Sequence, residues 1–138
     1  NKMSKSLDNC IYLDETKEEI WKKLSTAVTD TNRKRRSDPG NPDVCNIFTM
    51  HKAFSLKKDI DHCEQQCRSA GIGCLECKKI LLDNMYKELE PIQKKQKELR
   101  NKKEYVYDVL QDGKKRAKKI AVETIDEVYE KLGIKAFH

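Results

Sequence analysis

The chain has 138 residues, of which 38% are charged and 7% aromatic, with five glycines and three prolines. This composition favours long amphipathic helices in one domain, so we expect an all-α fold. The longest aliphatic run, Ile80-Leu81-Leu82, is far shorter than the roughly 20 apolar residues of a membrane span. No secretory signal pattern is found, so the expected location is the cytoplasm, with no membrane partner. The net charge of +6 is clustered, which indicates a polyanionic partner.

Residues 2–13 show no helical period and are expected to form a loop. Thr16 and Glu19 have the spacing of a capping box, which predicts a helix that ends near Thr29. Residues 32–42 are basic and rich in turn-forming residues. Asn41 and Pro42 then predict the start of a second helix. Its inner face is expected to consist of Val44, Ile47, Phe48 and His51.

A third helix is predicted over residues 56–70, with Gly71 as its left-handed cap. A long helix is predicted from Cys74, bent but not ended by Pro91. Gly113 is expected to end a short helix and Gly133 to end the last one. The inner face of the long helix is expected to include Leu81, Met85, Leu89, Ile92 and Leu99.

Five of the six cysteines fall between positions 45 and 77. Without a secretory signal this count favours metal or thiol chemistry over disulfides. The Cys67-x6-Cys74-x2-Cys77 spacing contains a chelating C-x2-C pair, and Cys45 is the natural fourth ligand. Four thiolates suit zinc as well as iron and sulfide, and buried free thiols are the plainer alternative.

The remaining candidate ligands are read as structural residues. Cys10 lies outside the cysteine cluster, and Cys63 lies one helical turn from Cys67, so both are interpreted as ordinary thiols. His51 and His62 have no ligand partner at i+3 or i+4 on their predicted helices, so neither is expected to bind a metal.

Basic residues form three runs, of which the one over residues 94–100 is interpreted as a solvated face. The run over residues 114–119 is predicted to lie at the start of a helix, where cations oppose the macrodipole, with acidic residues in the later turns. This charge order is the reverse of the one that stabilises a helix, so the basic residues of this run are expected to contact phosphates. The candidate nucleic-acid contacts in the first and last runs are Arg33, Arg35, Arg36, Lys114, Lys115 and Lys118.

Residues 2–6 read Lys-Met-Ser-Lys-Ser, the KMSKS signature of class I aminoacyl-tRNA synthetases. Four further stretches, residues 38–42, 44–48, 71–79 and 105–117, resemble bacterial tryptophanyl-tRNA synthetases in the same order. The resemblance covers essentially the whole chain. It implies residues 1–15 as the end of a Rossmann-type catalytic domain and residues 16–138 as a helical anticodon-binding domain. The chain is therefore expected to be a piece of a longer enzyme.

The resemblance implies the ligase reaction, in which tryptophan is activated by ATP with Mg²⁺ and transferred to tRNA(Trp). Lys2 and Lys5 are the implied catalytic residues, and Lys5 would bind the pyrophosphate-forming end of ATP. Met3, Ser4 and Ser6 would support them in binding ATP. Because the family's nucleotide-binding fold and tryptophan pocket precede this loop, the chain alone is expected to be inactive. The full enzyme is expected to be a homodimer.

Some members of the family carry a [4Fe-4S] cluster near the anticodon-binding region, which implies this cofactor for Cys45, Cys67, Cys74 and Cys77. The gap between Cys45 and Cys67 is one residue shorter than in the family pattern, so Cys63 stays open as a substitute for Cys67. The alternative hypothesis is an autonomous helical iron–sulfur or zinc module that binds nucleic acid and matches KMSKS by chance.

Overall fold

The computed structural model describes residues 3–7 and 9–134, and the regular structure among them is entirely helical, which confirms the all-α prediction. The chain divides into two compact units, Asn1–Lys94 and Lys95–His138. None of the helices in the described ranges is long and apolar enough to cross a membrane. The helices are α1 (Lys17–Thr26), α2 (Asn46–Phe54), α3 (Lys57–Arg68), α4 (Cys74–Arg100) and α5 (Lys103–Leu132), with short 3-10 turns η1 (Lys5–Leu7) and η2 (Pro42–Val44).

Helix α1 begins as its capping residues predict. The Thr16 hydroxyl accepts the Glu19 backbone N–H at 3.2 Å, and the Glu19 carboxylate accepts the Thr16 N–H at 2.7 Å. The helix ends at Thr26, three residues before the predicted end. Its buried residues are Ile20 and Leu24.

Helix α2 begins later than predicted. Asn41 caps only the short turn η2, and the α-helix starts at Asn46. Val44 therefore lies outside the helix and is 59% exposed, so its assignment to the inner face was wrong. Ile47 and His51 are buried as predicted, and so is Phe48.

Helix α3 ends at Arg68, two residues before the predicted end. Ala70, with φ of 60°, is the left-handed residue rather than Gly71. The chain has already reversed at this point, because the backbone N–H groups of Gly71 and Ile72 both donate to the Gln66 carbonyl at 2.7 and 3.2 Å. The predicted cap at Gly71 was wrong by one position.

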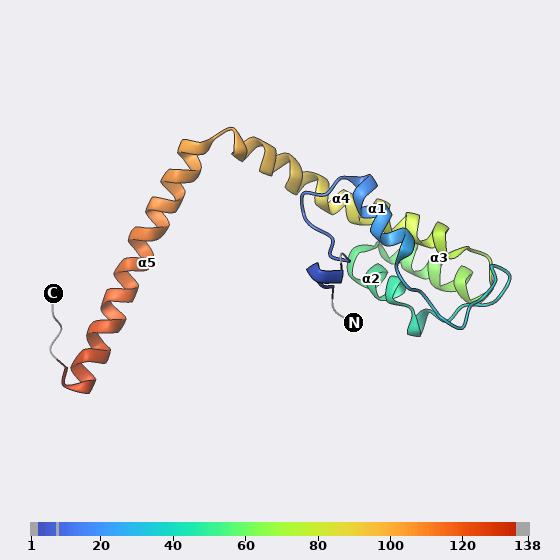
Figure 1. Cartoon of the computed structure of the whole chain (residues 1–138), viewed down its shortest axis with the longest axis horizontal. Helices are drawn as coiled ribbons and strands as arrows, with labels where there is room; N and C mark the ends of the chain where they lie inside the picture. Colours follow the sequence, from blue (N-terminus) through green and yellow to red (C-terminus); the bar gives the residue numbers. More distant parts are fainter. Residues whose placement is uncertain (1–2, 8, 135–138) are drawn as a thin grey trace. The chain divides into compact units, whose positions relative to one another are not determined.

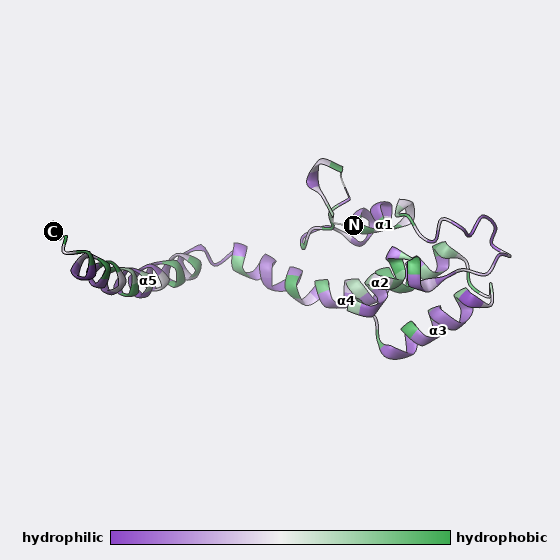
Figure 2. Ribbon diagram, turned by 90° about the horizontal axis from the view of Figure 1, so that it is seen from below, coloured by the Kyte–Doolittle hydropathy of each residue, from purple (hydrophilic) through white to green (hydrophobic). Residues whose placement is uncertain are grey.

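Helix α4 supplies most of the core of the first unit and runs past Pro91 without a break. Figures 1 and 2 show α1 and α2 beside its amino-terminal half, with hydrophobic residues concentrated on α2 and the adjoining part of α4. Ile92 is 47% exposed, so its assignment to the inner face was wrong. The buried hydrophobic cluster consists of Ile20, Leu24, Ile47, Leu81, Leu82, Met85 and Leu89.

The second unit contains one long helix, α5, where two were predicted. Gly113 lies within α5 and does not end a helix. A glycine inside a helix costs only about 1 kcal/mol relative to alanine, which the surrounding helical residues offset. Gly133 ends the helix in the left-handed conformation, with φ of 67°, as predicted.

Candidate functional site

The signature segment forms a compact turn at the start of the described chain. Lys5 begins η1 and its side chain is exposed. The Ser4 backbone N–H donates to the Asn9 side-chain oxygen at 2.7 Å, and the Ser4 and Ser6 hydroxyls are 2.8 Å apart. Lys2, the other predicted catalytic lysine, lies outside the described residues.

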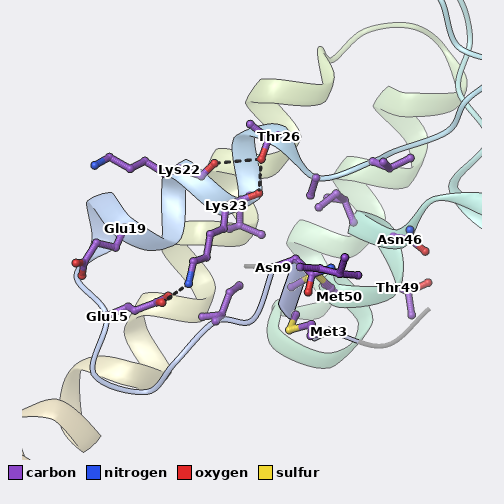
Figure 3. Close-up of a pocket in the computed structure, with 16 residues that line it drawn as sticks. Met3, Asn9, Glu15, Glu19, Lys22, Lys23, Thr26, Asn46, Thr49 and Met50 are labelled. Atoms are coloured by element: carbon purple, nitrogen blue, oxygen red, sulfur yellow. Dashed lines mark hydrogen bonds and ion pairs between the residues drawn. The ribbon is translucent and has the colours of Figure 1, made fainter. Parts of the chain in front are cut away.

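The segment that follows is tied to the helical unit. The Lys23 ammonium donates to the Cys10 carbonyl at 2.6 Å and pairs with the Glu15 carboxylate (Figure 3). The Gln93 amide donates to the carbonyls of Leu13 and Glu15 at 3.0 and 2.9 Å. These contacts fix residues 10–15 to α1 and α4, so the signature segment extends from an anchored stretch of chain.

A hollow of about 840 Å³ lies between the signature segment, α1 and α2 (Figure 3). Met3 and Met50 contribute to its lining together with Lys23 and Glu15. Lys5 is not among the lining residues. The hollow is therefore not assigned to ATP.

The four predicted cysteine ligands come together from three elements of the first unit. Cys45 caps α2, Cys67 lies at the end of α3, and Cys74 and Cys77 occupy the first turn of α4. All four are half-buried free thiols. Burial raises the pKa of Cys67, against the opposing charge of Arg33, and the neighbouring Cys45 and Cys74 raise it further. Cys67 thus lies close enough to Cys45 and Cys74 for their charges to interact. The charges of Cys45 and Cys67 likewise raise the pKa of Cys77.

Arg33 reaches into the space beside these cysteines. One terminal nitrogen lies 3.9 Å from the Cys67 sulfur and 3.8 Å from the Cys74 sulfur. The other donates to the carbonyls of Arg36 and Ile72 at 2.7 and 2.8 Å. The Arg33 Nε is buried without a hydrogen-bond partner among the described residues. The guanidinium therefore places a positive charge against the Cys67 and Cys74 sulfurs.

Gly40 is required where the turn-rich loop passes Cys67. Its backbone N–H donates to the Cys67 carbonyl at 2.9 Å, and a Cβ at this position would lie 2.5 Å from the Cys67 sulfur. A side chain there would displace the thiol. The close approach explains why the loop carries glycine at this point.

Lys78 is a second cation near the cysteines. It is 4% exposed, and burial lowers its pKa while the neighbouring Cys74, Cys45 and Cys77 raise it. Its ammonium donates to the carbonyls of Ser25 and Ala27 at 2.8 and 2.7 Å. A thiolate-ligated cluster carries net negative charge, so two adjacent cations fit such a group.

The spacing of the four sulfurs can be compared with what one zinc ion or one cubane cluster would require. Among the described residues, no three of Cys45, Cys67, Cys74 and Cys77 have their sulfurs within 4.8 Å of one another. A single zinc ion, with Zn–S bonds of about 2.3 Å, would need sulfurs less than about 4.6 Å apart. In a cubane cluster each thiolate binds a different iron, so wider spacing is expected. The four sulfurs are therefore spaced more widely than the ligands of one zinc ion would be.

A tighter group forms where sequence reasoning did not place one. The ligand atoms of His51, Cys63 and Cys77 all lie within 4.8 Å of one another. A hydrogen bond with Cys77 lowers the pKa of Cys63 to about 5, and the same contact raises that of Cys77. The three residues come from α2, α3 and α4, so local spacing gave no signal beyond Cys63 lying one turn before Cys67.

The basic candidates differ in accessibility. Arg33 is engaged as described, and Arg36 pairs with Glu76 at 3.3 Å while its side chain stays 62% exposed. Arg35 is exposed. Lys114, Lys115 and Lys118 are exposed on α5. Because α5 begins at Lys103, these lysines lie in mid-helix and do not oppose the helix dipole, so their predicted position at a helix start was wrong.

Comparison with known families identifies the class of protein. The family model for class I tRNA synthetases (W and Y) matches residues 1–90, and the chain belongs to this family. The match includes both the signature segment and the cysteine region. The alternative of an autonomous module with a chance KMSKS match is therefore not favoured.

Curated relatives narrow the comparison to tryptophan–tRNA ligases. The chain is 46% identical over 132 residues to that of Deinococcus radiodurans, covering 96% of this chain and 40% of the relative. It is 35% identical over 134 residues to that of Aquifex aeolicus, covering 96% of this chain and 34% of the relative. The chain thus spans about two fifths or less of these two proteins.

A solved structure shows the same fold. Tryptophanyl-tRNA synthetase from Campylobacter jejuni, complexed with ADP and tryptophane, matches with a TM-score of 0.79 and 29% identity. The match covers 96% of this chain and 41% of that one. The helical arrangement is therefore that of part of a tryptophanyl-tRNA synthetase structure.

Proposed function

We propose that this chain serves a tryptophan–tRNA ligase, which activates tryptophan with ATP and transfers it to tRNA(Trp). The observation that carries the proposal is the 46% identity over 132 residues to a tryptophan–tRNA ligase, which extends well beyond the five-residue signature. Cytoplasmic location and a homodimeric full enzyme belong to the same proposal.

In the first half-reaction, an oxygen of the tryptophan carboxylate attacks the α-phosphorus of ATP. The bond from that phosphorus to the bridging oxygen breaks, and pyrophosphate leaves with the bonding electrons. Lys5 and Lys2 place ammonium groups at the departing oxygens, where negative charge grows as the bond breaks. Their contribution is greater in the transition state than in the ground state, which is the condition for catalysis. Mg²⁺ accompanies the ATP.

The signature segment is suited to this task because the Lys5 side chain is exposed, while residues 10–15, which follow the segment, are anchored to the helices. The Ser4 and Ser6 hydroxyls hold the turn together and leave the lysine side chain free to reach a phosphate. Met3 belongs to the same supporting turn. Residues 1–15 are accordingly assigned to the catalytic part and residues 16–138 to tRNA binding.

The four cysteines are proposed to hold a [4Fe-4S] cluster, with Cys45, Cys67, Cys74 and Cys77 each ligating one iron. The group would join the ends of α2 and α3 to the start of α4 as a structural staple. Arg33 and the nearby Lys78 would offset its negative charge.

Recognition of tRNA is assigned to exposed cations. The proposed contacts comprise Arg35, Arg36 and the α5 lysines Lys114, Lys115 and Lys118, with Arg33 acting mainly at the cysteines. Phosphate neutralisation releases counterions and makes such binding strongly dependent on salt.

Binding of labelled tRNA(Trp) and tRNA(Tyr) to the chain, measured over a range of salt concentrations, tests the proposal. We expect tighter binding of tRNA(Trp). The triple Lys→Gln variant at positions 114, 115 and 118 should lower the slope of log affinity against log salt by about one per lysine. The matched triple variant at Lys94, Lys95 and Lys97 should change it little. Equal affinity for the two tRNAs would contradict the proposal.

A further inference from the structure

Three buried or half-buried ligands converge where α2, α3 and α4 meet. His51 and Cys63 are both 0% exposed, and the Cys77 sulfur lies 3.4 Å from the His51 Nε2. All three ligand atoms lie within 4.8 Å of one another. With Zn–N bonds of about 2.0 Å and Zn–S bonds of about 2.3 Å, one zinc ion fits this spacing. The spacing is too small for the corners of a cubane cluster.

We propose that His51, Cys63 and Cys77 form a second metal site, which binds a single Zn²⁺ when the four-cysteine site holds no cluster. Two thiolates and one neutral imidazole neutralise the ion, so the site can stay buried. Each of the two cysteines that is still protonated releases its thiol proton to solvent on binding. Three protein ligands leave the fourth tetrahedral position to a small donor such as water.

The surroundings of His51 support a ligand role. Its Nδ1 lies 2.8 Å from the Ser55 hydroxyl, and its Nε2 lies 3.1 Å from the Cys77 carbonyl. Without metal, Nε2–H donates to that carbonyl and Ser55 donates to Nδ1. With metal, the proton moves to Nδ1, and the same hydroxyl accepts it because a hydroxyl can play either part. Metal-binding histidines are commonly oriented in this way.

Cys77 belongs to both sites. His51 and Cys63 are not ligands of the proposed cluster, so the zinc site stands on its own geometry, and only the competition between the two sites rests on the proposed function. A zinc ion that takes Cys77 removes one of the four cluster ligands, so zinc and cluster exclude each other. Iron-poor conditions would then convert the chain into a zinc protein held together at α2, α3 and α4.

The test uses the full chain, iron-free and reduced, titrated with Co²⁺ as a spectroscopic probe and with Zn²⁺ in competition. The Cys45→Ser/Cys67→Ser/Cys74→Ser variant should still bind one Co²⁺ with thiolate charge-transfer bands. Adding Cys63→Ser or His51→Gln to that variant should weaken binding by at least about 100-fold, and adding Ser55→Ala by about tenfold. Adding Cys10→Ser should change nothing. Unchanged binding after adding Cys63→Ser would overturn the proposal.

X-ray absorption of the unmutated iron-free chain with one equivalent of Zn²⁺ gives a second readout that needs no multiple variant. We expect a shell with two sulfurs and imidazole nitrogen, and a shell of four sulfurs would overturn the site. Cys63→Ser chain prepared anaerobically should keep its iron and sulfide. Loss of zinc binding and loss of the cluster thus report on separate proposals.

Discussion

Lys78 is the buried cation that joins α1 to α4. Its two hydrogen bonds satisfy the carbonyls of Ser25 and Ala27 at the end of α1. Lys78→Met leaves both oxygens without this donor, so the free energy of unfolding should fall by about 2–3 kcal/mol. Urea unfolding of the iron-free chain measures the change. Lys79→Met, at the exposed neighbouring position, is the matched control, and equal effects of the two would contradict this role.

Asp30 organises the turn-rich loop that carries Arg33. Its carboxylate accepts the backbone N–H groups of Asn41 and Asn32 at 2.8 and 2.9 Å, and these bonds hold its pKa below the ordinary value. A lowered carboxyl pKa stabilises the fold above the unfolded-state pKa, and this stability is lost as pH falls through the folded-state value.

Asp30→Asn should therefore destabilise the chain at neutral pH, and its difference from the unmutated chain should shrink in acid. Denaturant unfolding at neutral and acid pH measures both values. Glu88→Gln, at an exposed position, is expected to change little at either pH. A deficit in Asp30→Asn that persists unchanged in acid would show that the carboxylate charge is not responsible.

At the scale of elements, α5 contains a glycine that the fold does not need. No neighbouring atom lies within 4 Å of a Cβ built at Gly113, and only Gly133 of the glycines has a positive φ. Gly113→Ala should raise the stability of α5 by about 0.5–1 kcal/mol. Gly133→Ala is a control with the opposite expected effect: alanine at a φ of 67° is strained, so this change should destabilise α5. Thermal unfolding followed by circular dichroism would contradict this if both changes acted in the same direction.

The same glycines show what local sequence signals can predict. Capping chemistry correctly predicted the start of α1 and the end of α5, because a hydrogen-bonded cap and a left-handed residue are local requirements. Gly113 was misread because the cost of a glycine in a helix is small beside the preference of its neighbours. At Ala70, the pairing of the following N–H groups with Gln66 moved the reversal forward by one residue.

Part of the candidate site could likewise be predicted from local sequence spacing, and part depends on how the helices pack. The C-x2-C pair and Cys67 are visible in the sequence because they are close along the chain. The grouping of His51 with Cys63 and Cys77 depends on how α2 and α3 pack against α4, which no local pattern encodes. The inward turn of Arg33, away from its basic neighbours, is a tertiary feature of the same kind.

At the scale of the whole molecule, all six cysteines lie in the first unit, Asn1–Lys94, and the proposed α5 phosphate contacts lie in the second, Lys95–His138. The cluster is thus proposed to fix the helices that follow the signature segment, while the α5 lysines act on tRNA separately. Loss of the cluster should therefore destabilise the first unit, whereas neutralising the α5 lysines should weaken tRNA binding without unfolding.

The most direct test of the cysteine assignment is iron and sulfide analysis of the anaerobically purified chain. We predict a brown protein with about four iron and four sulfide per chain, lost in Cys74→Ser and kept in the matched Cys10→Ser variant. A colourless chain without iron or sulfide after anaerobic reconstitution, or a cluster that survives Cys74→Ser, would contradict the account.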